Sequence, residues 1–449
     1  MDMGSETTRE YLEKLLKQAI KTLGFTPASF NIIVPEPDFG DYATNAALIL
    51  GKNLKKNPAE IAGSIAQAAE ALNKEQVFRE ISAVGGFVNF KLSDEYLAKQ
   101  ALRLAEFISF IPAGKGKKVI FEYSSPNTNK PLHIGHTRND VYGAACINLL
   151  KAIGYNVVTC EIINDRGSHI MKSVLMYMKH GEGKTPSAEK MKPDHFVGKF
   201  YQMFAAKAAE SQEAEKQLLE EAQNLLQKWE AGDAGIRKIW RQMNDWFFEG
   251  VKQTYEKEGS RFDEVNYESE IYDKGRDLVL QGVSKGIFVK EADGSVSVDF
   301  TDQGLDKKTL LRKDGTTLYI TQDMYLWDLR NRRHSPDLAI VTTSAEQVYH
   351  FRILKKIFEL FKYPWAENFK HLPYEHVFLG KNKMSSREGN AISADELLDS
   401  VKKQVREVMR GSERVKAKVD DEKLVQEIAF GAIKYGYLKY EPNTRIYFD

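Results

Sequence analysis

The chain has 449 residues, of which 42% are hydrophobic and 28% charged, and its formal net charge is +1. This length predicts two or three domains with sizeable cores. A protein that binds DNA nonspecifically would usually be strongly basic, but local basic patches can bind nucleic acid at a balanced total charge, so the net charge alone decides nothing. No apolar run approaches the roughly 18 residues of a membrane span, and the charged N-terminus lacks a signal core. We therefore expect a soluble, cytoplasmic protein without membrane contact, in which Cys146 and Cys160 are buried free thiols.

The first 111 residues predict a small separate α/β domain. Its expected elements are a helix over residues 8–23, a strand over 30–34, a helix from 46, a helix from 58, and a turn with a strand over 85–90. The first helix has an apolar stripe, and Pro58 suits the first turn of a helix. We expect Phe87 and Phe90 to be core residues. Residues 112–116, which contain proline and glycine, predict a linker.

Residues 117–163 predict a strand–loop–helix–strand unit. A short apolar run over 119–123 indicates a buried strand, and a loop interrupted by prolines follows it. A helical pattern then begins near residue 136 and ends before Gly154, which suits a C-terminal cap. Residues 156–163 predict the second strand.

The loop that opens this helix has the physical properties of a phosphate site. A helix N-terminus offers free N–H groups and a partial positive charge. Gly135 allows a ligand to approach the backbone closely, His133 and His136 can donate to phosphate oxygens, and Lys130 adds a full charge. Neither a dinucleotide fingerprint nor a P-loop pattern is present. Two alternatives stay open here: the histidine pair is accidental, or it binds a metal, for which no third ligand has an obvious spacing.

Residues 164–260 connect the second strand to a long helical region. Asp165 lies in the turn at the carboxyl end of that strand, where ligands collect in open α/β sheets, but it suits a cap of the following helix equally well, so we assign it no role. From about 181 to 260 the pattern predicts an insertion, with a charged helix over 210–229 and an aromatic-rich helix over 236–255. We expect the aromatic side chains of the second helix to be core residues: Trp240, Trp246, Phe247 and Phe248.

After residue 260 the pattern returns to short strands and helices. We expect a helix over 271–286, strands over 286–289, 295–298 and 309–312, a turn at 314–315, a parallel strand over 338–341, a helix over 348–362, and the last strand of the main sheet over 377–379. Residues 395–438 predict helices that are rich in lysine and arginine.

A second distinctive loop lies over residues 383–387, far downstream of the His-Ile-Gly-His stretch at 133–136. It reads Lys383-Met384-Ser385-Ser386-Arg387 and is basic and rich in serine. Together with the His-Ile-Gly-His of residues 133–136, it resembles the paired HIGH and KMSKS signatures of class I aminoacyl-tRNA synthetases. The second loop matches the first three positions of its signature and departs at the last two, and the order and separation of the loops suit the class.

The flanking residues resemble arginyl-tRNA synthetases. Residues 124–127 (SSPN) and 129–130 (NK) precede the first loop, residues 319–323 resemble the Y-x-T-x-D element of that family, and Gln347 with His350 resembles its Q-x-x-H element. The stretches GDYATN at 40–45 and GGFVNF at 85–90 are similar to the N-terminal domain of that family. The similarity runs from about residue 39 to the C-terminus and covers most of the chain.

This resemblance implies the ATP-dependent ligation of L-arginine to its tRNA through an arginyl-adenylate. The expected ATP-binding residues are His133, Gly135, His136, Lys383, Met384 and Ser385, with Mg²⁺ bridging the phosphates and no metal site formed by the protein. The expected catalytic residues are Lys130, His133, His136 and Lys383. Because Ser386 stands where KMSKS has its second lysine, either Lys130 or Arg387 would replace that charge, and we favour Lys130.

Arginine recognition needs carboxylates and planar acceptors around a guanidinium. By the same resemblance, Asp323 and Glu268 would take the side chain, and Tyr319 and Gln347 would fix its plane. Ser125, Asn127 and His136 would hold the amino-acid end of the substrate. Glu268 is equally compatible with a surface acid before a helix.

The expected fold class is α/β. The resemblance implies a Rossmann-like parallel-sheet catalytic domain over 117–394 with an insertion at about 181–260, an additional N-terminal domain over 1–111 that contacts tRNA, and a helical segment over 395–449. The basic helices after residue 395 either contact tRNA or solvate the surface. We expect a monomer that ends before the anticodon-binding domain of the family and is therefore weakly active. Two other classes stay open: a nucleotidyl transferase with a small substrate, and a non-enzymatic paralogue that binds tRNA or a partner protein.

Overall fold

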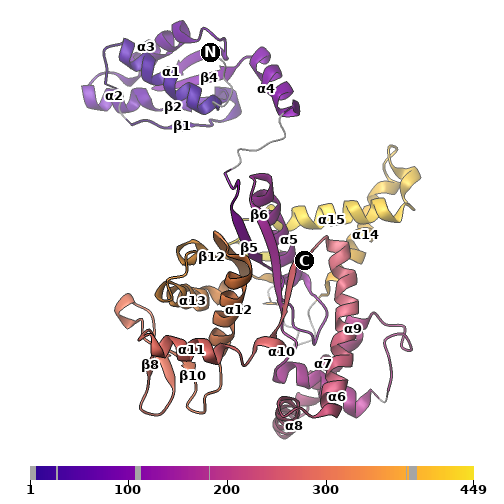
Figure 1. Cartoon of the computed structure of the whole chain (residues 1–449). Coiled ribbons are helices and arrows are strands. Elements are labelled where there is room, and N and C mark those ends of the chain that lie inside the picture. Colours follow the sequence, from indigo (N-terminus) through magenta and orange to yellow (C-terminus); the bar gives the residue numbers. More distant parts are fainter. Residues whose placement is uncertain are drawn as a thin grey trace. The chain divides into compact units, whose positions relative to one another are not determined.

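The computed structural model describes residues 7–26, 29–106, 113–181, 183–380, 382–383 and 392–448. The chain separates into two compact units, Met1–Phe110 and Ile111–Asp449, which we name the N-terminal and C-terminal units (Figure 1). None of the helices within the described ranges combines the length and the apolar character that a bilayer crossing requires. Both cysteines are free thiols, as expected; Cys160 is buried and Cys146 is partly buried.

The N-terminal unit is an antiparallel sheet packed against helices. Its elements are α1 (Thr8–Thr22), β1 (Ile32–Ile33), β2 (Tyr42–Thr44), α2 (Ala46–Leu54), α3 (Pro58–Leu72), β3 (Phe78–Val84), β4 (Phe87–Leu92) and α4 (Asp94–Glu106). The strands have the order β1-β2-β4-β3. The apolar stripe of α1 is buried, with Leu12, Leu16 and Ile20 at 0% exposure. Helix α3 begins where predicted because the side chain of Asn57 accepts a hydrogen bond from the N–H of Ala59 at 3.0 Å.

The stretches over residues 40–45 and 85–90 meet in this sheet. Tyr42 pairs with Phe90 and Thr44 with Val88 in antiparallel register. Gly40 has a φ of +112°, and a Cβ there would lie 2.7 Å from the carbonyl oxygen of Phe90, so this approach requires glycine. Phe90 is fully buried, which confirms it as a core residue, whereas Phe87 is only half-buried.

A five-stranded parallel sheet forms the centre of the C-terminal unit. Its strands are β5 (Lys118–Glu122), β6 (Asn156–Ile163), β7 (Glu264–Tyr267), β11 (Leu338–Ser344) and β12 (Phe369–Tyr374), in the order β12-β11-β5-β6-β7. Val119, Ile120 and Phe121 have 0% exposure, as expected for a strand covered on both faces. Helix α5 (Ile134–Ala152) connects β5 to β6. The α/β class and the predicted strand–loop–helix–strand unit are therefore confirmed.

A helical bundle is inserted between β6 and β7. Its helices are α6 (Ser168–His180), α7 (Pro193–Ala208), α8 (Gln212–Glu230) and α9 (Ala234–Glu258). Phe247 is fully buried, and Trp240, Trp246 and Phe248 pack against the core of the bundle. The prediction that these aromatic residues are core is confirmed.

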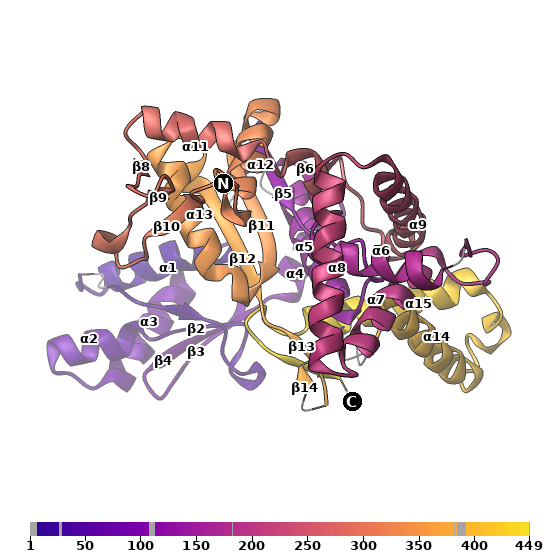
Figure 2. The same ribbon diagram turned by 90° about the horizontal axis from the view of Figure 1, so that it is seen from below.

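The chain between β7 and β12 packs elsewhere around the sheet. Its remaining elements are α10 (Glu268–Ile271), α11 (Gly275–Ser284), β8 (Val289–Lys290), β9 (Val296–Val298), β10 (Lys308–Leu311), α12 (Tyr319–His334) and α13 (Val348–Leu360). In both Figure 1 and Figure 2, α11 and α13 lie on the opposite side of β5 from α7 and α8. The helix expected over 271–286 is present as the shorter α11, and residues 272–274 form a turn between α10 and α11. The chain breaks after α10 so that α11 can pack on α12, where a Cβ on Gly275 would lie 2.3 Å from the carbonyl oxygen of Thr321.

A second, small sheet lies near the end of the chain. It contains β13 (Val377–Leu379), β14 (Asn382–Lys383) and β15 (Ile446–Phe448), and the helices α14 (Ala394–Arg410) and α15 (Glu422–Leu438) lie between β14 and β15 in sequence. The prediction that 377–379 is the last strand of the main sheet is wrong. Strand β12 occupies the edge beside β11, and β13 pairs with β15 instead. An apolar run indicates a strand, but the strand with which it pairs depends on tertiary contacts.

Arg138 of α5 binds the two segments that lead into β13 and β15 of the small sheet. Its guanidinium donates to the carbonyl oxygens of Glu375 at 2.6 Å, Pro442 at 3.1 Å and Thr444 at 2.9 Å. The residue is only 3% exposed, so these bonds pair a charge whose burial would otherwise be unfavourable.

A buried ion pair lies beneath the main sheet. Arg330 of α12 has 0% exposure, donates to the carboxylate of Glu122, and donates to Asn266 Oδ1 at 3.1 Å. Its guanidinium lies 5.0 Å from the ring of Trp327. Burial raises the pKa of Glu122, and the charge of Arg330 acts against that rise.

Candidate active site

The topology of the main sheet indicates where a ligand would bind. Strand β6 lies on one side of β5 and β11 lies on the other, so the strand order reverses between β5 and β11. In open parallel sheets, ligands bind outside the carboxyl ends of the strands at such a switch point. The segment after β5 contains Ser125 and His133, and the segment after β11 contains Gln347. The topology therefore brings predicted site segments to the same edge of the sheet.

Residues 133–136, which we name the histidine turn, cap helix α5. His133 Nδ1 accepts a hydrogen bond from the N–H of Gly135 at 3.1 Å, and His136 Nδ1 accepts one from the N–H of His133 at 3.0 Å. The centres of the two rings lie 3.8 Å apart. A Cβ on Gly135 would lie 3.0 Å from the His133 ring, so glycine leaves room for this ring to fold back over the start of the helix.

Both histidines are neutral at pH 7. Burial and the charge of Lys130 lower the pKa of His133 to about 3, and burial, with the neighbouring His133 and Lys130, lowers the pKa of His136 well below its usual range. In a neutral imidazole whose Nδ1 accepts a hydrogen bond, the proton is on Nε2. Each ring therefore offers an Nε2–H donor, which can bind an anionic oxygen without taking up a proton.

Backbone hydrogen bonds join the histidine turn to the segment that precedes α14. The N–H of Ile134 donates to the carbonyl oxygen of Ile392 at 3.1 Å, and the N–H of Ala394 donates to that of Leu132 at 2.9 Å. The chain therefore returns to the histidine turn directly after the predicted second loop.

The second loop itself is described only at its start. Lys383 ends β14, where its backbone pairs with Phe378. Three predicted residues, Met384, Ser385 and Arg387, lie outside the described residues. Lys130, the alternative source of the missing charge, precedes the histidine turn, and its charge acts on both histidines.

The chain leaves β5 in a strained turn. Ser124 and Ser125 have φ values of +66° and +60°, in the left-handed region that residues other than glycine rarely adopt. Ser125 Oγ accepts a hydrogen bond from the N–H of Ile162 at 3.2 Å. Asn139 of α5 accepts one from the N–H of Ser124 and donates to the carbonyl oxygen of Thr342, each at 3.1 Å. The turn is thus bonded to β6 through Ile162, and Asn139 connects it to β11 through Thr342. Asn127 follows it and pairs with Asn164 in a parallel bridge.

The residues expected to bind the arginine side chain lie on two helices. Glu268 begins α10 and is 3% exposed, so the alternative that it is a surface acid is wrong. Tyr319 and Asp323 lie one turn apart on α12, and the charge of Asp323 acts on Glu268. Asp323 Oδ2 accepts a hydrogen bond from His350 Nε2 at 2.5 Å. Gln347, three residues before His350, is exposed.

Asp165 has a contact that its sequence neighbourhood does not indicate. Its carboxylate accepts hydrogen bonds from the N–H of Ser269 at 2.8 Å and from Ser269 Oγ at 2.6 Å. Helix α6 begins after Gly167 without a side-chain cap, so the capping alternative for Asp165 is wrong. Asp165 instead fixes the start of α10 beside Glu268. Because Ser269 lies 104 residues further along the chain, no local pattern could have found this contact.

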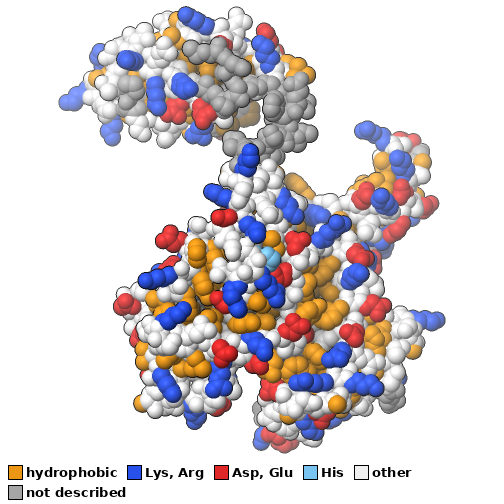
Figure 3. All heavy atoms as spheres, viewed as in Figure 1, with side chains coloured by type: hydrophobic (Ala, Val, Ile, Leu, Met, Phe, Trp, Pro, Cys, Tyr) orange, Lys and Arg blue, Asp and Glu red, His pale blue; other side chains and the backbone are white. Residues whose placement is uncertain are grey.

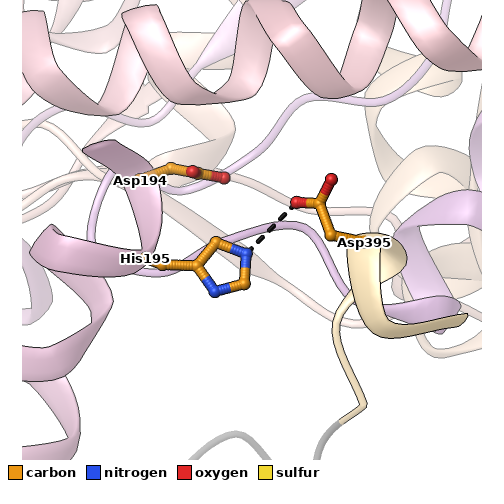
Figure 4. Close-up of side chains that lie close together, drawn as sticks. All are labelled: Asp194, His195 and Asp395. Atoms are coloured by element: carbon orange, nitrogen blue, oxygen red, sulfur yellow. Dashed lines mark hydrogen bonds and ion pairs between the residues drawn. The ribbon is translucent and has the colours of Figure 1, made fainter. Parts of the chain in front are cut away.

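A charged cluster connects the helical bundle to α14. Asp194, His195 and Asp395 place three potential metal-ligand atoms within 4.8 Å of one another, and His195 Nε2 donates to Asp395 at 3.1 Å (Figure 4). However, Lys192 Nζ lies 2.6 Å from Asp395 and 3.2 Å from Asp194, and Lys257 Nζ lies 3.0 Å from Asp395. Two ammonium groups already neutralise the carboxylates, so we interpret the cluster as an ion-pair network rather than a metal site.

Two protein-family descriptions match the chain. Residues 99–449 match "tRNA synthetases class I (R), catalytic domain", and residues 10–92 match "Arginyl tRNA synthetase N terminal domain". The arginine–tRNA ligase of Treponema denticola is 38% identical over 431 residues, which cover 94% of this chain and 72% of that protein. The arginine–tRNA ligase of Amoebophilus asiaticus is 37% identical, with 96% of this chain and 75% of that protein covered.

A solved structure agrees with these relatives. The arginyl-tRNA synthetase of Thermus thermophilus superposes with a TM-score of 0.73 at 25% identity, over 98% of this chain and 77% of that chain. The family match covers both units, and the relatives align along most of their own length. The chain therefore belongs to the arginyl-tRNA synthetases, a family of the class I tRNA synthetases.

Proposed function

We propose that this chain joins L-arginine to its tRNA in an ATP-dependent reaction that passes through an arginyl-adenylate. The main support is one arrangement at the carboxyl edge of the sheet: a neutral histidine turn at a helix N-terminus, with the carboxylates of Glu268 and Asp323 on neighbouring helices. The first part suits a triphosphate and the second suits a guanidinium. Membership of the arginyl-tRNA synthetase family supports the same reaction.

The first step would form the adenylate. A carboxylate oxygen of arginine bonds to the α-phosphorus of ATP, the bond from that phosphorus to the bridging oxygen breaks, and pyrophosphate leaves. The Nε2–H groups of His133 and His136 would donate to phosphate oxygens, and the N-terminus of α5 adds partial positive charge. Lys130 and Lys383 would supply full charges, and Gly135, Met384 and Ser385 would complete the ATP site. Mg²⁺ bound to ATP would neutralise part of the triphosphate charge, and the Nε2–H donors of the histidine turn suit the phosphate oxygens.

Arginine would bind on the Glu268 and Asp323 side. These two carboxylates would pair with the guanidinium, and Tyr319 and Gln347 would restrict its plane. His350 already occupies one oxygen of Asp323, which fixes the direction of the other. The amino-acid end would lie near Ser125, Asn127 and His136. A lysine ammonium cannot pair with two carboxylates in the planar manner of a guanidinium, so lysine should be rejected.

The second step transfers arginine from the adenylate to the terminal ribose of tRNA. We propose that the N-terminal unit and the basic helix α14 contact the tRNA. Part of the positive charge of α14 is used within the chain, because Lys402 and Arg406 both pair with Glu422. Figure 3 shows basic and acidic side chains interspersed over the visible face, which agrees with the net charge of +1. Local patches would therefore bind the tRNA phosphates. We propose that the chain acts as a monomer.

The first test is calorimetric titration of a non-hydrolysable arginyl-adenylate analogue, with the lysyl analogue as control. This measurement needs neither turnover nor tRNA. We expect tight binding of the arginyl analogue alone. Binding of neither analogue, or equal binding of both, would contradict the proposal.

Replacement of Asp323 tests the amino-acid side of the site. Asp323→Ala should weaken binding of the arginyl analogue by about 2–5 kcal/mol, because it removes one partner of a hydrogen-bonded charge pair, and should leave ATP binding unchanged. Asp328→Asn is the matched control, since Asp328 lies on the same helix but accepts its hydrogen bond from Tyr363. Retained affinity for the arginyl analogue in Asp323→Ala would count against the assignment.

A further inference from the structure

We propose that Arg166 is a positioning residue for arginine recognition, which holds one oxygen of Glu268 and leaves the other for the guanidinium of the substrate. The inference rests on the function proposed above, because that function assigns Glu268 to the substrate. Arg166 follows Asp165 in the turn between β6 and α6.

The guanidinium of Arg166 is held by aromatic rings and by a carboxylate. It lies 4.0 Å from the centre of the Tyr272 ring and 5.8 Å from that of Trp229. It also forms an ion pair with Glu230, the last residue of α8, and its side chain is only 11% exposed. A guanidinium that is both stacked and paired has a well-defined orientation.

This oriented cation faces one oxygen of Glu268. Arg166 Nη1 lies 3.9 Å from Glu268 Oε1, whereas Glu268 Oε2 is buried and has no hydrogen-bond partner in the described part of the chain. A buried carboxylate oxygen without a donor is unfavourable unless a ligand supplies one. The guanidinium of substrate arginine, with its five N–H donors, would supply a donor to this unpartnered oxygen.

The surrounding charges show why Glu268 needs a neighbouring cation. Asp165, from the turn after β6, and Asp323, from α12, act on Glu268 as like charges. Burial raises the pKa of Glu268 to about 7, the charge of Arg166 acts against that rise, and the charges of Asp165 and Asp323 add to it. Without Arg166, Glu268 would be mostly protonated at neutral pH, whereas with Arg166 it is about half protonated. A protonated carboxyl group cannot form an ion pair with the substrate.

The contact also links the arginine pocket to the helical bundle. Arg166 reaches Glu230 and Trp229 at the end of α8, while Trp240 of α9 donates to the carbonyl oxygen of Asp165 at 2.6 Å. The bundle therefore contributes to the position of the turn that supports Glu268.

The test is the pH dependence of analogue binding in wild type, R166M and R166Q. The arginyl-adenylate analogue would be titrated by calorimetry from about pH 6 to about pH 8.5. In wild type, affinity should fall as the pH drops below about 7, because Glu268 gains a proton. In both variants the midpoint should move upward by about one unit or more, so that Kd at pH 7, where Glu268 is already about half protonated in wild type, rises about fivefold or more and recovers at higher pH. R166Q keeps hydrogen-bond donors and most of the side-chain length, so it still tests the proposal if R166M fails to fold.

R237M is the matched control. Arg237 of α9 also stacks on Trp229, at 5.2 Å, and donates to the Trp229 carbonyl oxygen, but it is not among the charges that act on Glu268. R237M should leave the pH midpoint of analogue binding unchanged. Wild-type binding with an unmoved midpoint in R166M and R166Q would overturn this inference alone. Absence of wild-type binding at every pH would overturn the proposed function and this inference with it.

Discussion

Replacement of Arg330 by methionine tests how the main sheet tolerates a buried charge. The methionine side chain fills much of the space of Arg330 but leaves Glu122, whose side chain is 8% exposed, without its cation. Removal of one partner of a buried ion pair destabilises a protein by about 3–5 kcal/mol, because the other charge is left uncompensated. Since a folded domain is stable by only about 5–15 kcal/mol, this loss would be a large part of the total.

The loss in R330M should grow with pH. Burial raises the pKa of Glu122 and Arg330 acts against that rise, so removal of Arg330 raises the pKa further. The native variant then retains a proton that the unfolded chain releases near its ordinary pKa of about 4.3. For a group whose pKa is raised in the folded state, the free energy of unfolding is highest below the unfolded pKa. As the pH rises from there to the folded pKa, that free energy falls by up to about 1.4 kcal/mol per pH unit. The difference from wild type should therefore be larger at about pH 8 than at about pH 6.

Urea unfolding followed by tryptophan fluorescence measures this effect. All five tryptophans lie after residue 110, so the signal reports on the C-terminal unit alone. R333M is the control, because Arg333 lies on the same helix, is 52% exposed and pairs with Glu264 at 2.6 Å; it should lose less than about 1 kcal/mol. The double variant E122Q/R330M should recover much of the stability, since it buries no unpaired charge. Equal losses in R330M and R333M, or a loss independent of pH, would refute the reasoning.

Two further predictions concern charges near the histidine turn. Lys130→Ala should slow adenylate formation by about 100-fold or more, measured by pyrophosphate exchange with tRNA present, because the Lys130 charge would act on the triphosphate. Affinity for the arginyl analogue should change only slightly. Comparable losses in both would reject that role. Asp395→Asn should lower the free energy of unfolding of the C-terminal unit by about 1–3 kcal/mol, because Lys192 and Lys257 lose a shared acceptor. Asp399→Asn is the control: its side chain is 76% exposed, so it should change the free energy of unfolding by less than about 0.5 kcal/mol in the same urea titration. Equal effects of the two substitutions would contradict this account.

Short-range patterns predicted the elements whose signals lie within a few residues. The buried strand over 119–121 and the helix that follows the histidine turn were predictable because strand and helix periods are properties of short windows. The start of α3 was predictable for the same reason, since its cap, Asn57, and its first residue, Pro58, are adjacent. The histidine turn and Asp323 were found as candidates because each belongs to a compact motif.

Contacts between distant segments were not predictable in this way. Arg166 forms its ion pair with Glu230, 64 residues away, and Asp165 binds Ser269, 104 residues away, so a local pattern contains neither partner. The strand over 377–379 was recognised, but its partner, residues 446–448, lies far along the chain, next to a segment that Arg138 links to α5. The neutral form of the histidines likewise depends on burial, which only the assembled fold provides.

The bonds of Arg138 have a consequence for synthesis on the ribosome. Arg138 donates to Thr444, 306 residues later, and the carbonyl oxygen of Ile134 accepts a hydrogen bond from Tyr437, 303 residues later. At a translation rate of about 5–20 residues per second, roughly 15–60 s separate the synthesis of α5 from that of these partners. The N-terminal unit is complete long before, but α5 lacks its contacts with Tyr437 and Thr444 during this interval. Nascent chains that stop short of these residues therefore cannot complete the surroundings of the histidine turn, however much of the main sheet they contain.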